Sequence, residues 1–224
     1  MEKPKEQTEE EKLKEIKETA RMRKIAIILV IGFILLFILA LVGVKYFIKT
    51  EPIEYPKVTY NNFEFTEIAD TWYAQWQHEN SLVSLAMRFN PYEVENVTVL
   101  GELNENFRKK QIYVTFDPYS EQESFKYLAL AAAEMSQSLV KAFNKKIIPA
   151  CTREHNETCE NVTIVTCEDT EKAVIQLVAA EPTQIKLENN CITLQGKEFE
   201  IIRSVDKLLY LWYKIMTLTP GMSQ

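Results

Sequence analysis

The chain contains twenty consecutive residues, Ile25 to Val44, that carry neither a charged nor a polar side chain. At about 1.5 Å rise per residue, a helix of this length is roughly 30 Å long, the thickness of a hydrocarbon core. A helix on the surface of a soluble domain has a polar stripe, and this run has none. The sequence therefore predicts one transmembrane helix at about residues 25–47.

A cleaved signal peptide is the alternative interpretation of this run. Its apolar region would span about 7–15 residues and end at an A-x-A-like site. Here the run is longer, and it ends in Val42-Gly43-Val44-Lys45, a poor match to such a site. We therefore expect an uncleaved signal-anchor and a single-pass membrane protein.

The basic residues that flank the span predict its orientation. Within about fifteen residues of the span, more basic residues precede it than follow it, and such an excess favours the cytoplasmic side. They are Lys12, Lys14, Lys17, Arg21, Arg23 and Lys24 before it, against Lys45, Lys49 and Lys57 after it. We expect a charged cytoplasmic tail at residues 1–24 and an extracytoplasmic domain at residues 50–224, held at the cell membrane.

The composition of residues 50–224 argues against several classes of function. This part has sixteen basic and twenty-five acidic residues, whereas nucleic-acid binding needs clustered lysine and arginine. Its glycines are Gly101, Gly196 and Gly221, too sparse for a phosphate-binding loop. A catalytic triad would have to use His78 or His155, each in a polar, turn-like stretch typical of surface histidine. The sequence predicts no cofactor, no catalytic residues and no nucleic-acid partner.

Four cysteines predict disulfide bonds rather than a metal site. Cys151, Cys159, Cys167 and Cys191 are separated by seven, seven and twenty-three residues, which does not suit the close pairs of a zinc site. Outside a membrane, clustered cysteines are typical of disulfides. Three pairings are possible, and we favour Cys151–Cys159 with Cys167–Cys191, because the first closes a small polar loop and the second can join two strands.

Three sequons match the N-glycosylation acceptor. They begin at Asn96, Asn156 and Asn161, and the last two flank Cys159. All three lie after the membrane span, so the sequence is compatible with a glycoprotein.

The pattern of apolar residues predicts an α+β domain. Strands are expected at residues 58–65, 71–77, 81–89, 111–116, 162–166, 173–178 and 185–194, the last folding back at Asn189-Asn190. A capping box at Ser120 and Glu123 predicts the start of a long helix that Pro149 would end. A second helix is expected at residues 198–216. We expect a single two-layer domain with a mainly antiparallel sheet and two long helices.

The second of these helices is apolar on most of its surface. One face should pack on the sheet, and a neighbouring face carries Leu208, Leu211 and Ile215. Either the first long helix covers this neighbouring face, or it is exposed and docks an envelope protein or a second copy of the chain. The polar residues left to reach water are Glu200, Arg203, Ser204, Asp206, Lys207 and Lys214.

The stretch around Cys191 resembles a short module of archaeal extracytoplasmic proteins. The resemblance rests on Cys167, Val174-Ile175-Gln176-Leu177, Asn190-Cys191-Ile192-Thr193-Leu194, Gly196 and Val205-Asp206-Lys207-Leu208. The whole chain is similar to small membrane-anchored archaeal proteins to which no activity is assigned. The resemblance implies an archaeal cell-surface protein and brings no catalytic residues; a eukaryotic type II membrane glycoprotein is the alternative.

These features favour a non-enzymatic envelope module that binds or assembles with another component. An anchored hydrolase of envelope polymers is a second hypothesis, which requires a cleft with converging carboxylates. A carbohydrate-binding module is a third. It would use the aromatic cluster Trp72, Tyr73 and Trp76, and it requires that both tryptophans be exposed.

Overall fold

The computed structural model describes residues 9–47, 54–78, 81–103, 107, 109–155 and 157–217. The chain divides into two compact units, residues 1–54 and 55–224. The first contains helix α1 (Glu9–Phe47), whose stretch Lys17–Gly43 is long and apolar enough to cross a membrane. Its apolar side chains are exposed, as expected of side chains that would face lipid. This helix fits a single-pass membrane anchor.

The second unit begins with a four-stranded antiparallel sheet whose strands follow chain order. Its strands are β1 (Lys57–Tyr60), β2 (Phe63–Glu67), β3 (Trp72–His78) and β4 (Ser81–Met87). The predicted single strand at residues 58–65 is wrong, because Asn61 and Asn62 have φ of 44° and 69° and turn the chain into a hairpin. Asparagine tolerates this left-handed conformation, which two-residue hairpin turns require. The predicted antiparallel pairing is confirmed for this sheet.

A seven-stranded sheet follows, in the order β5-β10-β11-β9-β6-β7-β8. Its strands are β5 (Thr98–Leu103), β6 (Gln111–Phe116), β7 (Lys146–Cys151), β8 (Thr163–Ile164), β9 (Ala173–Val178), β10 (Gln184–Asn189) and β11 (Cys191–Gln195). Strands β10 and β11 form the predicted antiparallel hairpin, with Asn189 at φ 54° in the turn. The other neighbouring pairs are parallel, so this sheet is mixed and the expectation of mainly antiparallel pairing holds for the smaller sheet.

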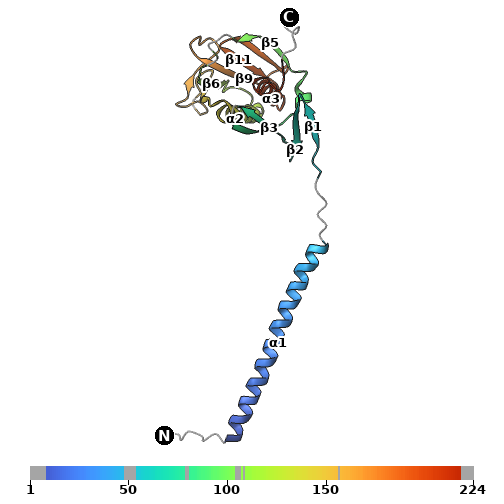
Figure 1. Ribbon diagram of the computed structural model, residues 1–224. Coiled ribbons are helices and arrows are strands. Elements are labelled where there is room, and N and C mark those ends of the chain that lie inside the picture. Colours follow the sequence, from blue (N-terminus) through green and yellow to red (C-terminus); the bar gives the residue numbers. More distant parts are fainter. Residues whose placement is uncertain are drawn as a thin grey trace, which may run out of the picture. The chain divides into compact units, whose positions relative to one another are not determined.

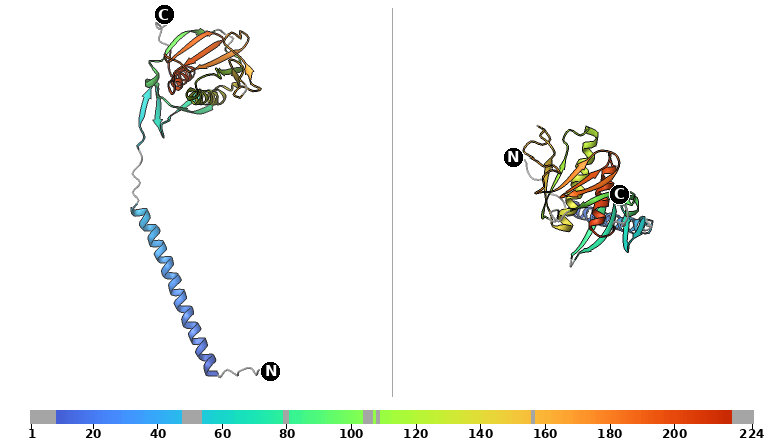
Figure 2. Two further views of the ribbon diagram at one scale, coloured as in Figure 1. Left: turned by 180° about the vertical axis from the view of Figure 1, so that it is seen from behind. Right: turned by 90° about the horizontal axis from the view of Figure 1, so that it is seen from above.

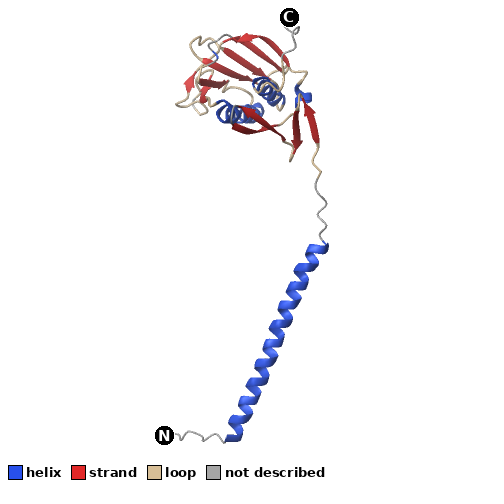
Figure 3. Cartoon of the chain, in the orientation of Figure 1, coloured by secondary structure: helices blue, strands red, loops and turns tan. Residues whose placement is uncertain are grey.

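Two helices, α2 (Gln122–Phe143) and α3 (Glu200–Trp212), lie between the two sheets (Figures 1 and 2). On one side, the rings of Phe65 in β2 and Trp76 in β3 contact Tyr210 and Tyr213 at the end of α3. On the other side, α3 packs on β10 and β11, and α2 packs on β7 and β9. The domain therefore has three layers, with helices flanked by strands in Figure 3, instead of the predicted two. Helices that are apolar on two sides can bury both only between two covers.

The ends of α2 differ from the prediction. The helix begins at Gln122, and the cap at Glu121 makes no side-chain hydrogen bond. The predicted capping box is wrong, because the Ser120 hydroxyl instead donates to the carbonyl of Asp117 (2.8 Å). Asn144, at φ 49°, ends the helix before Pro149, which lies inside β7.

Helix α3 is more buried than its sequence suggests. It ends at Trp212, short of the predicted Met216. Ser204, Asp206 and Lys207, which were expected to reach water, are all buried. Each finds a polar partner in the protein: the Ser204 hydroxyl, for example, donates to the carbonyl of Gln195 (2.7 Å). A short 3-10 helix, η1 (Pro91–Val94), packs against α3 and connects the two sheets.

Candidate binding site

An apolar cavity of about 440 Å³ lies between one end of the seven-stranded sheet and the C-terminal end of α3. Apolar side chains form most of its wall, with one lysine and one threonine among them. The lining residues are Val99, Leu103, Leu187, Leu208, Leu211, Trp212, Lys214, Met216 and Thr217. A concave surface of this size, lined mainly by apolar groups, is typical of a binding site for an apolar ligand or side chain.

The sheet wall of this cavity comes from β5 and β10, which pair in parallel. Val99 and Leu103 are four residues apart in β5, so both point to the same face of the sheet. Gly101 lies between them and has φ +79°, and a Cβ there would lie 2.2 Å from the carbonyl oxygen of Leu187. Only glycine fits this close approach without a shift of the neighbouring strand. Gly101 therefore allows the two strands to form this wall together.

The helix wall comes from the face on which the sequence predicted a partner contact. Leu208 and Leu211 line the cavity; Leu208 is buried and Leu211 is half-buried. Ile215 is fully buried in the core and does not line it. The predicted face is thus not openly exposed, and two of its three residues border a cavity. The expectation that the first long helix covers this face misses β5 and β10, which supply the opposite wall.

The outer face of the same two strands carries negative charge. Glu102 of β5 lies directly beside Glu188 of β10 in the register, and both side chains are exposed. Like charges in neighbouring positions across a sheet are destabilising. Among the described residues, no ion pair compensates either carboxylate. This corner of the sheet therefore combines an apolar hollow on one face with an unbalanced acidic pair on the other.

The proposed carbohydrate platform is wrong, because both tryptophans are in the core. Trp72 and Trp76 are 8% and 7% exposed. The indole N–H of Trp76 donates to the carbonyl of Tyr213 (2.9 Å), and its ring contacts Phe143. Of the three aromatic residues, Tyr73 is the one that reaches the surface.

Two disulfide bonds, Cys151–Cys159 and Cys167–Cys191, confirm the favoured pairing. They hold the segment between β7 and β9 against the face of the seven-stranded sheet that points away from the helices. Ala150, Val165, Val174 and Cys191 form a small second core there. The bridges thus stabilise a cover for the sheet and leave no free thiol among the four cysteines.

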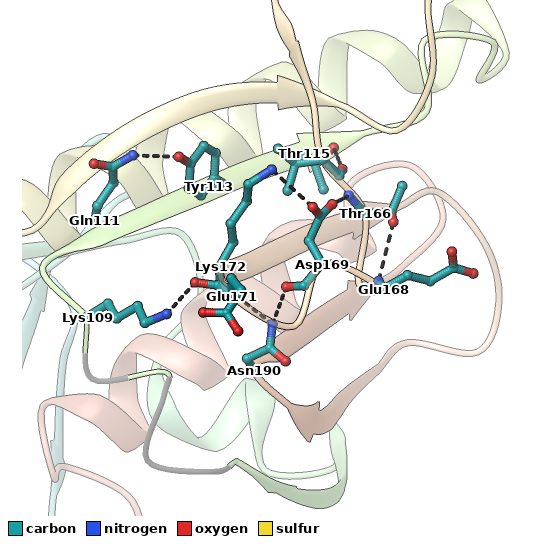
Figure 4. Close-up of polar contacts among 11 residues, drawn as sticks. Lys109, Gln111, Tyr113, Thr115, Thr166, Glu168, Asp169, Glu171, Lys172 and Asn190 are labelled. Carbon is teal, nitrogen blue, oxygen red and sulfur yellow. Dashed lines mark hydrogen bonds and ion pairs between the residues drawn. The ribbon is translucent and has the colours of Figure 1, made fainter.

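A polar network completes this cover and ties its end to the sheet (Figure 4). Asp169 accepts hydrogen bonds from the N–H of Thr166 (2.9 Å) and from Lys172 Nζ (3.0 Å). The Thr166 N–H, with Lys172 second, lowers the pKa of Asp169 below its ordinary value. Asn190, in the turn between β10 and β11, donates to the carbonyls of Asp169 and Lys172. These groups satisfy one another, so we interpret the network as a structural clamp.

A second, polar cavity of about 390 Å³ lies in the first disulfide loop. Its lining includes His155, one of the two histidines that a catalytic triad would have to use. Nδ1 of His155 accepts from the N–H groups of Glu157 (3.3 Å) and Thr158 (3.1 Å), and its ring contacts Tyr119. These two hydrogen bonds occupy Nδ1 of His155 and stabilise the backbone of the loop. The side chain of His78, the other candidate, lies outside the described residues.

Two of the three glycosylation sequons can be placed. Asn96 and Asn161 are exposed, whereas Asn156 lies outside the described residues. The side-chain oxygen of Asn96 accepts a hydrogen bond from Arg203 (2.5 Å), whereas a glycan would join the amide nitrogen.

One strongly perturbed carboxyl group lies apart from both cavities. Asp206 is buried in α3 and accepts hydrogen bonds from the backbone N–H groups of Arg88 and Phe89, both at 2.9 Å. Burial raises its pKa to about 8, although these two donors act in the opposite direction. It is not part of either cavity wall, so its geometry assigns it to the core. The described residues contain no group of three or more possible metal ligands.

No family model matches this chain, and no curated protein or solved structure shows significant similarity to it.

Proposed function

We propose that this chain is a membrane-anchored, non-enzymatic module whose extracytoplasmic domain binds or assembles with another component of the cell envelope. The observation that carries the proposal is the apolar cavity beside β5, in a domain whose surface is otherwise rich in charge. An apolar concavity is suited to receive a side chain from a partner, and its half-buried Trp212 is of a residue type enriched among the anchors of protein interfaces. The archaeal resemblance supports a place at an archaeal cell surface.

The same proposal places residues 1–24 in the cytoplasm and the folded domain outside. The excess of basic residues before the span supports this orientation, and so do the two disulfides, which persist in oxidising compartments. The exposed sequons at Asn96 and Asn161 would then be available to a glycosylation machinery.

Labelling with a membrane-impermeant amine reagent tests the orientation. On intact cells, exposed lysines such as Lys57 and Lys126 should be modified, while Lys12 and Lys14 should be spared. Permeabilised cells serve as the control, because there all four should react. Protection of Lys57 and Lys126 together with modification of Lys12 and Lys14 in intact cells would reverse the assignment.

A charge placed in the cavity wall tests the binding function. In membranes extracted with a mild detergent, we expect the full-length chain to migrate as part of a larger assembly. Leu211→Asp should release it to the size of the chain alone, since burying an unpaired carboxylate in an interface is strongly unfavourable. The matched control is Val140→Asp, which changes an exposed apolar residue of α2, and it should leave the assembly intact.

Thermal unfolding of the extracted variants separates lost binding from lost folding. The Leu211→Asp chain should retain a cooperative unfolding transition, because Leu211 is only half-buried. If wild type, Leu211→Asp and Val140→Asp all migrate at one size, the cavity is not the site of assembly.

A further inference from the structure

Strand β5 is the last strand at its end of the seven-stranded sheet. It pairs with β10 along one edge, and among the described residues no hydrogen bond reaches the backbone groups of its other edge. A row of unpaired N–H and C=O groups is a template for another strand. Proteins that recognise extended peptides use such an edge for affinity and nearby pockets for specificity.

The cavity lies where the side chains of an added strand would point. Val99 and Leu103 of β5 line it from the helix-facing side of the sheet, and an added strand would present alternate side chains to that side. These side chains would reach the space bounded by Leu211 and Trp212 of α3. Apolar residues at every second position of the added strand fit this wall.

The outer face of the sheet determines which residues fit the remaining positions of an added strand. The intervening side chains of an added strand would lie on the outer face, next to Glu102 and its neighbour Glu188. A basic residue at the position beside Glu102 would compensate the two adjacent carboxylates, for which the described residues supply no ion pair. We propose that the free edge of β5 accepts an extended peptide segment of an envelope partner, with alternating apolar and basic residues. This inference rests on the proposed binding function and names the chemistry of its partner.

A second copy of the chain fits this edge poorly. It would bring another Glu102 to the acidic corner if it paired through its own β5, and its domain has more acidic than basic residues. Like-charge contacts of this kind disfavour association. The acidic pair therefore selects a basic partner over self-association.

The test uses the full-length protein in nanodiscs of zwitterionic phosphatidylcholine and a fluorescent, end-capped hexapeptide of alternating lysine and valine. Fluorescence anisotropy should show saturable binding above the signal of empty nanodiscs. Changing Glu102→Lys and Glu188→Lys together should weaken this peptide by about ten-fold or more and favour one of alternating glutamate and valine. Glu160→Lys, in the disulfide loop, is the matched control and should bind as the wild type does.

Two N-methylated versions of the peptide test the pairing of the strands. Methyl groups on the lysine nitrogens block one edge of an extended peptide, and methyl groups on the valine nitrogens block the other. One version should lose about ten-fold or more in affinity, and the other should bind nearly as well as the parent. Equal affinities of the two versions would show that the peptide does not extend the sheet. No effect of the double charge reversal would show that the acidic pair does not select the peptide.

Two further results would reject the inference in different ways. Absence of saturable peptide binding, while Leu211→Asp still disrupts assembly in membranes, would overturn the strand-addition mode and leave the proposed function standing. A dimer of the peptide-free chain in nanodiscs that Leu211→Asp dissociates would assign the edge to a second copy instead.

Discussion

Replacing Asp206 with alanine is expected to lower the free energy of unfolding by about 2–4 kcal/mol, because two backbone N–H groups would lose their buried acceptor. The carboxyl group of Asp206 holds the backbone of Arg88 and Phe89, just after β4, onto α3. Tyr210, one turn later, donates its hydroxyl to the carbonyl of Phe89 (2.6 Å). Asp206 and Tyr210 therefore attach this backbone segment to α3 at adjacent points, and alanine at 206 removes one of them.

The protonation of Asp206 should also make stability depend on pH. Its pKa in the folded protein is about 8, because burial raises it, and an unfolded aspartate titrates near 3.9. Between these values the folded protein binds a proton that the unfolded chain releases, so this contribution is fully present below about pH 4 and declines as pH rises toward about 8. The other titratable groups that face it are Arg88 and Glu134, which form an ion pair of 2.7 Å, together with Tyr210 and Tyr213.

Asp206→Asn separates the hydrogen bonds from the charge. An amide oxygen can still accept from the two N–H groups and carries no proton that titrates. Thermal unfolding followed by tryptophan fluorescence at pH 5 and pH 8 should show a smaller difference in Tm for Asp206→Asn than for the wild type. Asp70→Asn, at an exposed turn, is the control and should keep the wild-type difference. An Asp206→Asn chain with the wild-type pH dependence would contradict a buried titration at this residue.

Removing the disulfide Cys167–Cys191 with a pair of serines is expected to destabilise the domain by about 3–4 kcal/mol. The bridge closes a segment with a sequence separation of 24, against 8 for Cys151–Cys159. In the chain-entropy account, a longer closed loop restricts the unfolded chain more. Replacing Cys151 and Cys159 with serines should therefore cost less, about 2–3 kcal/mol. Cys191 also lies in the small second core, so its replacement loses apolar packing as well.

Denaturant titration of the two double-serine variants, next to the wild type, measures this order. The reduced wild-type protein is the natural control, since it should approach a variant that lacks both bridges. A larger loss for the Cys151 and Cys159 pair than for the Cys167 and Cys191 pair would mean that loop entropy does not decide the ranking.

Strands and turns that have a strong local sequence pattern could be predicted from the sequence. Strands β6 and β9 were expected at residues 111–116 and 173–178, and the structure has them at those bounds. The turn at Asn189 was also expected, because asparagine tolerates its left-handed backbone. In these cases alternation or turn chemistry within a few residues is sufficient.

Strands β5 and β7 were not predicted from the sequence, because the strands that pair with them are far away in the sequence. Strand β5 pairs with β10, and Gly101 interrupts its apolar pattern where the two backbones approach. Strand β7 contains Pro149, which sequence reasoning takes as a helix stop. The two-residue strand β8 pairs with Ala150 and Cys151 alone, so at Pro149 that side of β7 needs no ladder bond.

Of the two walls of the candidate site, the sequence indicated only the helix wall, because the sheet wall depends on long-range strand pairing. The excess of apolar residues on α3 pointed to Leu208 and Leu211, but not to the strands that complete the cavity. The acidic pair Glu102 and Glu188 could not be seen either, because the two residues become neighbours only through the parallel pairing of β5 with β10. Sequence patterns within one element thus indicated a surface, and tertiary pairing made it a site.

The position of α3 between the two sheets has a consequence for how the chain is made. Synthesis proceeds from the N-terminal helix α1 onward, and the hairpins of the four-stranded sheet can form as soon as they emerge. Helix α2 covers part of the inner faces, but neither cover is complete until α3 arrives near the end of the chain, because residues from Ile201 to Tyr210 fill the rest of the space between the sheets. Strand β5 must likewise wait for β10 before it has a neighbour. Apolar strand residues of the growing chain therefore stay partly uncovered until α3, its last helix, packs between the two sheets and closes the domain.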